Sequence, residues 1–192
     1  MDNNKLILGL RQKDEAVFRY FVDTYQTRVF NTVVSMVQHH EEAEDIAQEV
    51  FIEVYNSINS FKGDSKISTW VYRIAVNKAL EAFRKKKTAK RFSFLTSFFG
   101  DKNAELVYDK PDFEHPGIVL ENKERAVILF RAINKLPENQ KTAFVLHNIE
   151  GLSYQEIVEV MQISLSSVES LLFRAKTNLR VTLKTYYKIE TS

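Results

Sequence analysis

The chain has 192 residues, enough for one ordinary domain or two small ones, and its 44% hydrophobic content is that of a folded protein. It contains no cysteine, which excludes a disulfide framework, a thiolate zinc site and a thiol nucleophile. No stretch approaches the roughly 20 apolar residues that span a bilayer, and the first residues lack the pattern of a secretory signal. We therefore expect a cytoplasmic protein.

The net charge of +2 conceals two segments of opposite charge. Eight basic residues and a single acid lie between Arg73 and Arg91, whereas six acids and no base lie between Glu41 and Glu53. A chain with one basic and one acidic face predicts two macromolecular partners of opposite charge.

The first part of the chain is predicted to be helical. Apolar residues recur near every fourth position from Phe18 to Val37 and again from Ile46 to Ile58, which indicates two amphipathic helices. A turn at Phe61–Asp64 precedes a third helix, which we expect to be capped by Ser68 and to continue into the basic run. Residues 1–91 are therefore expected to form a helical bundle.

A linker is expected over residues 92–120. Of the five Gly and three Pro, four fall between Gly100 and Gly117, and that stretch also holds five acids against two lysines without sustained periodicity. Such a composition is typical of a flexible acidic connector.

Residues 121–188 are predicted to form a second helical module. An apolar stripe precedes Pro137, Gly151 is placed to end the following helix, and Ser153–Glu156 has the form of a capping box. A short helix over Tyr154–Met161, a turn and a long final helix then follow. This order is typical of a helix-turn-helix that enters the major groove, although a packed helix pair in a bundle would show the same periodicity.

The basic run beginning at Arg84 indicates nucleic-acid binding. Lysine and arginine neutralise phosphates, and a side chain such as Asn77 can pair with base edges. The aromatic residues Phe61, Trp70 and Tyr72 could stack on unpaired bases, although a lone tryptophan is more often part of a core. A solvated helix end whose cations complement the dipole is the alternative, but the density of the cluster favours nucleic acid.

No catalytic site is predicted. The four histidines do not form a metal-ligand pattern, and no glycine-rich loop could cradle a phosphate. We therefore expect no enzymatic activity, no metal, no cofactor and no small-molecule substrate.

Three ordered motifs resemble a known family. They are Ala43–Phe51 (AEDIAQEVF), Ile67–Asn77 (ISTWVYRIAVN), and Leu136–Glu138 (LPE) with Gly151–Ile157 (GLSYQEI). Together they closely resemble the extracytoplasmic-function (ECF) group of bacterial sigma factors, over nearly the whole chain apart from the linker and the ends. The resemblance implies an all-α fold with two small helical domains, a sigma region 2-like bundle and a sigma region 4-like helix-turn-helix, joined by the acidic linker.

The resemblance also implies a function and its residues. The chain would bind core RNA polymerase, recognise the minus-thirty-five and minus-ten promoter elements and promote DNA melting. Core polymerase would contact the acidic helix at Asp45, Gln48, Glu49 and Glu53. The minus-ten strand would contact the turn and basic helix at Phe61, Lys62, Asp64, Lys66, Trp70, Asn77, Lys78, Glu81, Arg84 and Lys85. The minus-thirty-five duplex would contact Tyr154, Ser166, Ser167, Glu169, Ser170, Arg174 and Lys176. An anti-sigma protein, often membrane-bound in this family, is the further partner implied.

One segment departs from the family pattern. Where relatives carry a Gly-Thr-Val-Lys-Ser-Arg-like sequence, this chain has Ser166–Leu171 (SSVESL). An acidic and an apolar residue therefore replace two basic residues. Glu169 could accept a hydrogen bond from a cytosine amine or face solvent. A stand-alone dimeric helix-turn-helix regulator and an RNA-binding regulator are the alternatives. The acidic helix and the strand-binding basic helix favour the sigma factor, because a repressor needs neither.

Overall fold

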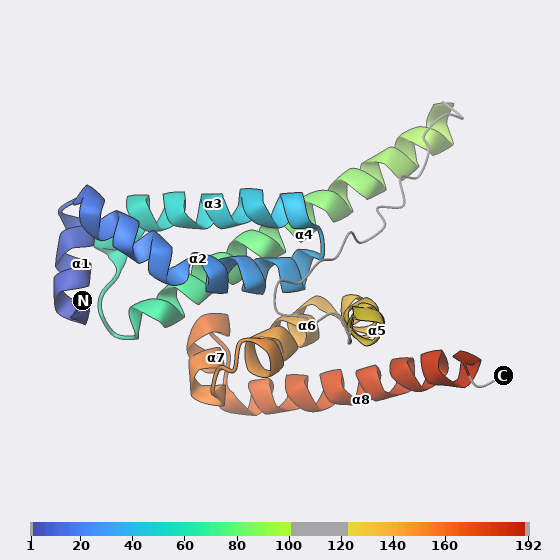
Figure 1. Cartoon of the computed structure of the whole chain (residues 1–192). Helices are drawn as coiled ribbons and strands as arrows, with labels where there is room; N and C mark the ends of the chain where they lie inside the picture. Colours follow the sequence, from blue (N-terminus) through green and yellow to red (C-terminus); the bar gives the residue numbers. More distant parts are fainter. Residues whose placement is uncertain (1, 101–122, 191–192) are drawn as a thin grey trace.

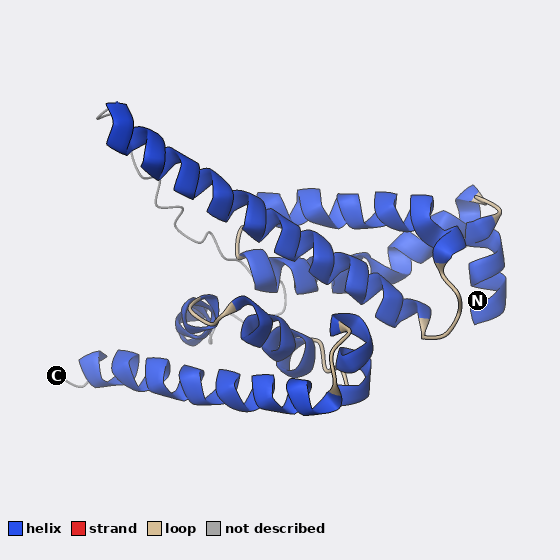
Figure 2. Ribbon diagram, turned by 180° about the vertical axis from the view of Figure 1, so that it is seen from behind, coloured by secondary structure: helices blue, strands red, loops and turns tan. Residues whose placement is uncertain are grey.

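The computed structural model describes residues 2–100 and 123–190, and within those ranges the regular structure is helical (Figures 1 and 2). The N-terminal helices lie together as one bundle, and the C-terminal helices pack beneath it in the view of Figure 1. Within the described residues, no helix is long and apolar enough to cross a membrane. The all-α fold expected from the sequence is confirmed.

The N-terminal module is a helical bundle. Its elements are α1 (Asn3–Arg11), α2 (Glu15–Val37), α3 (His40–Ser57), the short 3-10 turn η1 (Ile58–Ser60) and the first half of α4 (Ile67–Gly100). Asp14 begins α2 because its carboxylate accepts hydrogen bonds from the backbone N–H groups of Ala16 and Val17, at 2.9 and 3.1 Å. Gln38 ends α2 in a left-handed conformation, with φ of 56°.

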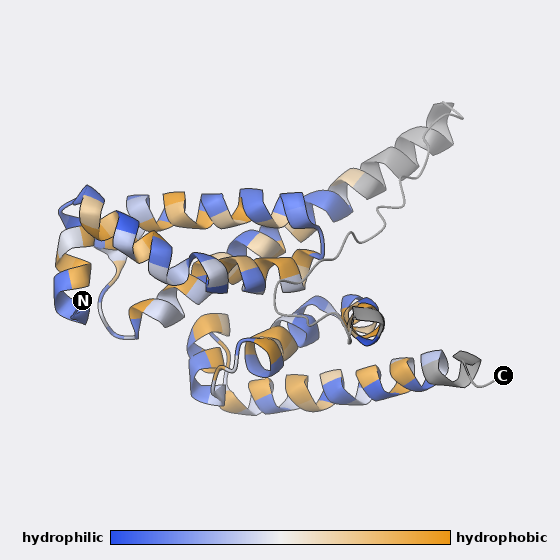
Figure 3. Cartoon of the chain, in the orientation of Figure 1, coloured by the Kyte–Doolittle hydropathy of each residue, from blue (hydrophilic) through white to orange (hydrophobic). Residues whose placement is uncertain are grey.

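The core of this module lies where α2, α3 and α4 meet. The predicted stripes bury Val29 and Val33 of α2 against Val50 and Val54 of α3, with Val71 of α4 beside them. In Figure 3 the hydrophobic side of α3 faces its neighbours, and its hydrophilic side faces outward. The acidic side of α3 is therefore left on the surface.

The structure differs from the sequence-based expectation at three places in this module. Helix α1 was not predicted, although it buries Leu6 and Leu10. Helix α4 begins at Ile67, so Ser68 lies in its first turn and is not its cap. The same helix continues to Gly100, past the expected start of the linker at residue 92. The rest of the predicted linker lies outside the described residues.

The C-terminal module ends in the predicted helix-turn-helix. Its elements are α5 (Lys123–Asn134), α6 (Glu138–Phe144), the π-helical turn η3 (Val145–Ile149), α7 (Tyr154–Met161) and α8 (Leu165–Glu190). Gly151 has φ of +71°, a backbone conformation that suits the residue after a helix end. The capping box is confirmed, since Ser153 and Glu156 exchange side-chain to backbone hydrogen bonds.

The two modules share a continuous hydrophobic core. Met36 of α2 and Val76 and Ala79 of α4 are buried together with Ile133, Leu146 and Val160 of the C-terminal module. This packing brings α4 alongside α7 and the start of α8, and it decides which side chains of the two modules lie opposite one another.

Candidate nucleic-acid and polymerase interfaces

The beginning of α8 is fixed by serine hydroxyls. Ser164 precedes the helix, and its Oγ accepts a hydrogen bond from the backbone N–H of Ser167 at 3.2 Å. The hydroxyls of Ser166 and Ser167 lie 3.1 and 2.8 Å from the same oxygen. The first turn of the predicted reading helix therefore presents small polar groups instead of cations.

Helix α8 has one buried side and one exposed side. Val168, Leu172, Ala175 and Leu179 are buried in the core. Ser166, Ser170, Phe173 and Thr177 recur at three- and four-residue spacing on the opposite side, and all four are exposed. Phe173 has 73% of its surface exposed, more than any other large hydrophobic residue in the described part of the chain.

Sequence reasoning did not identify Phe173 as a candidate contact. Helical periodicity places it on the same side as Ser166 and Ser170, and this signal could have found it. The other predicted minus-thirty-five contacts differ in their exposure. Glu169, Arg174 and Lys176 are exposed. Tyr154 is half-buried, and its ring packs edge-on with that of His147, with 5.0 Å between the ring centroids.

The predicted minus-ten residues on α4 divide into two groups. Asn77 and Arg84 are exposed. Lys78 is half-buried, and its Nζ lies 3.6 Å from a carboxylate oxygen of Glu49 and 3.8 Å from one of Glu53. Two predicted polymerase contacts therefore form ion pairs with a predicted DNA contact.

Several other basic side chains of this surface are also paired. Lys85 lies 3.1 Å from Glu81, and its hydrogen bond is the main cause that lowers the pKa of that carboxyl. Lys66 lies 2.9 Å from Glu156 of α7, and this contact lowers the pKa of Glu156 to about 2, with smaller contributions from Ser153. Exposed ion pairs of this kind contribute little stability, so phosphates can displace them.

The turn before α4 is exposed, but its aromatic neighbours are not. Lys62 and Asp64 lie in solvent on either side of Gly63, whose φ of +85° suits a tight turn. Phe61 is only 4% exposed, Tyr72 is buried, and Trp70 is half-buried with its ring 5.3 Å from that of Phe61. The aromatic rings considered for base stacking are thus largely packed into the core in this structure.

The exposed side of α3 combines acids with apolar groups. Asp45, Gln48 and Glu49 are exposed, and Ile52 lies between them and the end of the helix with 60% of its surface exposed. Tyr55 is also exposed. Ile52 was not among the predicted contacts, although an isoleucine one helical turn after Gln48 lies on the same side by periodicity.

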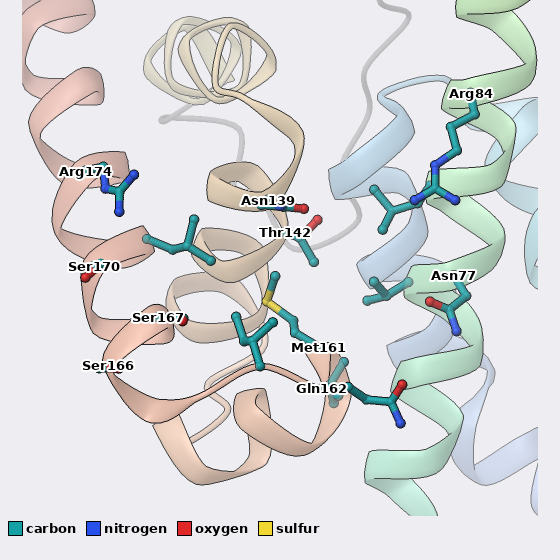
Figure 4. A pocket seen from close by; sticks show the side chains of 15 residues that line it. Asn77, Arg84, Asn139, Thr142, Met161, Gln162, Ser166, Ser167, Ser170 and Arg174 are labelled. Carbon is teal, nitrogen blue, oxygen red and sulfur yellow. The ribbon is translucent and has the colours of Figure 1, made fainter.

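A cavity of about 630 Å³ separates the predicted minus-ten and minus-thirty-five residues (Figure 4). Asn77 and Arg84 line it from α4, and residues of α8 line it from the other side. Those α8 residues are Ser166, Ser167, Ser170, Leu171 and Arg174. Gln162 and Met161 extend from the α7–α8 turn between the two walls.

Two ionisable residues of the C-terminal module lie beside the N-terminal module, Lys141 buried and Glu150 half-buried. Burial raises the pKa of Glu150 to about 7, while hydrogen bonding to the Tyr72 hydroxyl opposes that shift. Burial lowers the pKa of Lys141 to about 7. Its Nζ donates to Asn134 at 2.7 Å and lies 4.6 Å from the centre of the Phe83 ring of α4.

No group of histidine and acidic side chains in residues 2–100 and 123–190 is arranged to hold a metal ion.

Comparisons with known proteins agree on one family. The family model for sigma-70 region 2 matches residues 21–89, and the model for sigma-70 region 4 matches residues 121–179. The RNA polymerase sigma-H factor of Pseudomonas aeruginosa is 33% identical, covering 91% of this chain and 90% of its own length. The ECF RNA polymerase sigma factor SigW of Bacillus subtilis is 32% identical, covering 94% and 96%.

Two solved structures share the fold. CnrH, solved in complex with the cytosolic domain of CnrY, matches 95% of this chain and 97% of its own with a TM-score of 0.68 and 17% identity. RpoE of Bartonella quintana, solved with the anti-sigma factor NepR, matches 87% and 96% with a TM-score of 0.62 and 19% identity. The helical modules, the ordered motifs and the near full-length relatives lead to one conclusion: this chain belongs to the ECF group of the sigma-70 family of RNA polymerase sigma factors.

Proposed function

We propose that the chain is a non-enzymatic specificity subunit that contacts core polymerase and promoter DNA through three separate helix faces. The acidic and apolar side of α3 binds core polymerase. The turn at Lys62–Lys66 and the exposed side of α4 hold the melted minus-ten strand, and the exposed side of α8 reads the minus-thirty-five duplex. The observation that carries this proposal is the placement of three chemically distinct surfaces on three different helices of one small chain.

The division suits the physics of promoter opening. A melted strand exposes bases that can be flipped and read on their pairing edges, at a cost of a few kcal/mol per base. A duplex element instead requires a helix in the major groove, which is about 12 Å wide. We extend the proposal to an anti-sigma partner, because one solved structure of this fold, RpoE of Bartonella quintana, was captured with the anti-sigma factor NepR.

The test is run-off transcription with core polymerase, with and without this chain, on a library of genomic fragments. We expect discrete promoter-dependent transcripts only when the chain is present. A stand-alone regulator, which the family comparisons do not favour, would bind duplex DNA but give no such transcripts with core polymerase alone.

Removing two cations of α4 is expected to weaken binding to melted DNA. Arg84→Ala with Lys85→Ala should lower the affinity for a pre-melted minus-ten bubble. The plot of log affinity against log salt concentration should also become less steep by about 1.4, because each lost phosphate contact on a single strand removes about 0.7 from the slope. Fluorescence anisotropy across a salt series measures both. Lys5→Ala with Arg19→Ala removes the same charge elsewhere on the module and should leave the slope nearly unchanged. Equal slopes for the two double variants would refute the placement.

Phe173 is expected to contact a thymine methyl group in the minus-thirty-five element. Apolar side chains read this methyl in the major groove. Since a mismatched base pair in a recognition site costs about 1–3 kcal/mol, Phe173→Ala should weaken duplex binding by about tenfold. Val181→Ala truncates another exposed apolar residue of α8 and serves as the control.

The sharper measurement replaces thymidine by deoxyuridine, which removes only the methyl group, at each position of a duplex selected with the holoenzyme. The parent chain should lose affinity at one position where Phe173→Ala loses none. If both chains respond alike at every position, Phe173 does not read a methyl group.

A further inference from the structure

Helix α1 packs against the segment that leads into the turn at Lys62–Lys66, here called the minus-ten turn (Figure 1). Leu6 and Leu10 of α1 are 5% and 3% exposed, and they lie in the same core as Ile58 of η1 and Phe61. Burial of these apolar side chains keeps α1 in place. The C-terminal end of α1 is therefore held close to the point where the minus-ten turn begins.

The last residue of α1, Arg11, binds the backbone at the start of this turn. Its Nη2 donates a hydrogen bond to the carbonyl oxygen of Phe61 at 2.6 Å, across 50 positions of the chain. An arginine guanidinium is permanently charged, so this hydrogen bond is shorter and stronger than one between neutral groups. The Phe61 ring is 4% exposed, and the Phe61 N–H donates to the carbonyl of Ile58 at 3.1 Å. The residue before the turn is thus fixed through both its side chain and its backbone.

The far end of the minus-ten turn is fixed by α4. The backbone N–H of Trp70 donates to the carbonyl of Lys66 at 3.2 Å, in the first turn of that helix. Between the two anchored ends Lys62, Gly63 and Asp64 are exposed, and no neighbouring group of the described chain packs where a side chain at Gly63 would lie. The middle of the turn is therefore open to a base while its two ends are held.

A second cation makes a similar contact at a different place. Lys13 lies between α1 and α2, and its Nζ donates to the carbonyl of Tyr55 and lies 3.7 Å from the centre of the Tyr55 ring. Tyr55 belongs to the last turn of α3, where a cation complements the helix dipole. Lys13 therefore attaches the α1–α2 segment to α3, whereas Arg11 attaches it to the minus-ten turn.

We propose that Arg11 is a positioning residue of the minus-ten site, which acts through the Phe61 carbonyl to hold the minus-ten turn in the conformation that receives a flipped base. The proposal rests on the function proposed above, because that function assigns this turn to the melted strand. A turn that is ordered before the base arrives binds more tightly, since no loss of chain freedom then opposes binding. Arg11 itself needs no contact with DNA.

Arg11→Met in the full chain tests this role on a pre-melted minus-ten bubble from a promoter selected with the holoenzyme. In a series of bubbles, each nucleotide of the exposed strand is replaced in turn by an abasic residue. The captured base is the one whose removal weakens binding of the parent chain most, as measured by fluorescence anisotropy. On the intact bubble Arg11→Met should bind about fivefold more weakly than the parent, the change that the loss of one average hydrogen bond produces. On the bubble that lacks the captured base, the two chains should bind equally.

Three further variants separate this role from charge and from stability. Arg19→Met removes an exposed cation of α2 and should leave every affinity near the parent value. Lys13→Met removes the comparable contact at α3 and should bind the intact bubble as the parent does, although it lowers the urea midpoint of unfolding to a similar extent. Arg11→Lys keeps the charge and can donate to the same carbonyl, so it should restore most of the lost affinity.

Four results would overturn the positioning role. An equal loss for Arg11→Met on both bubbles, with a salt slope less steep by about 0.7, would show a direct phosphate contact. An equal loss in Lys13→Met would show that Arg11 only stabilises the fold. Parent affinity of Arg11→Met for every bubble would remove the role of Arg11 and leave the function of the turn standing. If the parent chain binds every abasic bubble as it binds the intact one, no base is captured, and the proposed function of the turn fails as well.

Discussion

Asp45→Arg combined with Ile52→Arg should abolish binding to core polymerase. Both side chains lie on the exposed side of α3, and neither contributes to the module's core, so the helix should remain folded. We expect each of the two to act as an interface hot spot, where a single truncation costs about 2 kcal/mol. Two such losses correspond to a decrease in affinity of about a thousandfold.

Co-purification with core polymerase and titration by fluorescence anisotropy measure this effect. Asp23→Arg with Leu8→Arg replaces one exposed acid and one exposed apolar residue of α2 and α1, and should leave binding nearly unchanged. Unaltered affinity of the α3 variant would move the polymerase contact to another surface. Equal losses in both double variants would indicate a general effect of charge.

The contribution of Glu150 and Lys141 to the free energy of unfolding should be smallest near pH 7. In the folded chain the pKa of Glu150 is about 7 because of burial, against an ordinary value of 4.5. Raising the pH from about 4.5 to 7 therefore lowers the free energy of unfolding, since the unfolded chain loses its proton first, and further increases have no effect through Glu150. Arg28 and Tyr72 face this carboxyl from α2 and α4, and both oppose the shift without reversing it.

Lys141 produces the opposite slope above neutrality. Its pKa is about 7 when buried, against an ordinary value of 10.5, and Glu138 on its own helix only partly opposes the effect. Raising the pH from 7 toward 10.5 therefore raises the free energy of unfolding, because the buried amine is already neutral while that of the unfolded chain is still charged. Below pH 7 the amine is charged in both states, so it does not change the free energy of unfolding.

Urea unfolding followed by circular dichroism from pH 5 to 9 should show this minimum in the free energy of unfolding. Glu150→Gln should remove the acid limb of the curve, and Lys141→Met should remove the alkaline limb. A curve that slopes in one direction across the whole range, or that keeps both limbs in these variants, would show that other groups control the stability of the fold.

The local sequence was sufficient to predict most of the helices. Periodic apolar residues predicted α2 and α3, and the Ser153–Glu156 pair predicted both the start of α7 and its hydrogen bonds. These features act over three or four residues, so a short stretch of sequence is sufficient to predict each helix and its cap. The ordered motifs likewise indicated the family, which the comparisons confirm.

Long-range contacts decided what local patterns could not. Phe61 and Tyr72 are aromatic residues that could stack on bases, but their burial depends on residues far along the chain. Lys78 carries a positive charge that could contact a phosphate, but it forms ion pairs with Glu49 and Glu53 of a neighbouring helix. Periodicity shows which side of a helix is polar, and only packing shows what lies opposite that side.

The sequence by itself determined the all-helical fold and the separation of acidic from basic charge, because composition and helical spacing are local properties, and its ordered motifs indicated the sigma family by resemblance. The tertiary structure alone decided that Asn77 and Arg84 lie across a cavity from the first turns of α8, and that Glu150 and Lys141 lose water at the module boundary. Both results depend on residues far apart in the chain, such as Tyr72 and Glu150 or Phe83 and Lys141, whose contact is set by the shared apolar core of the modules.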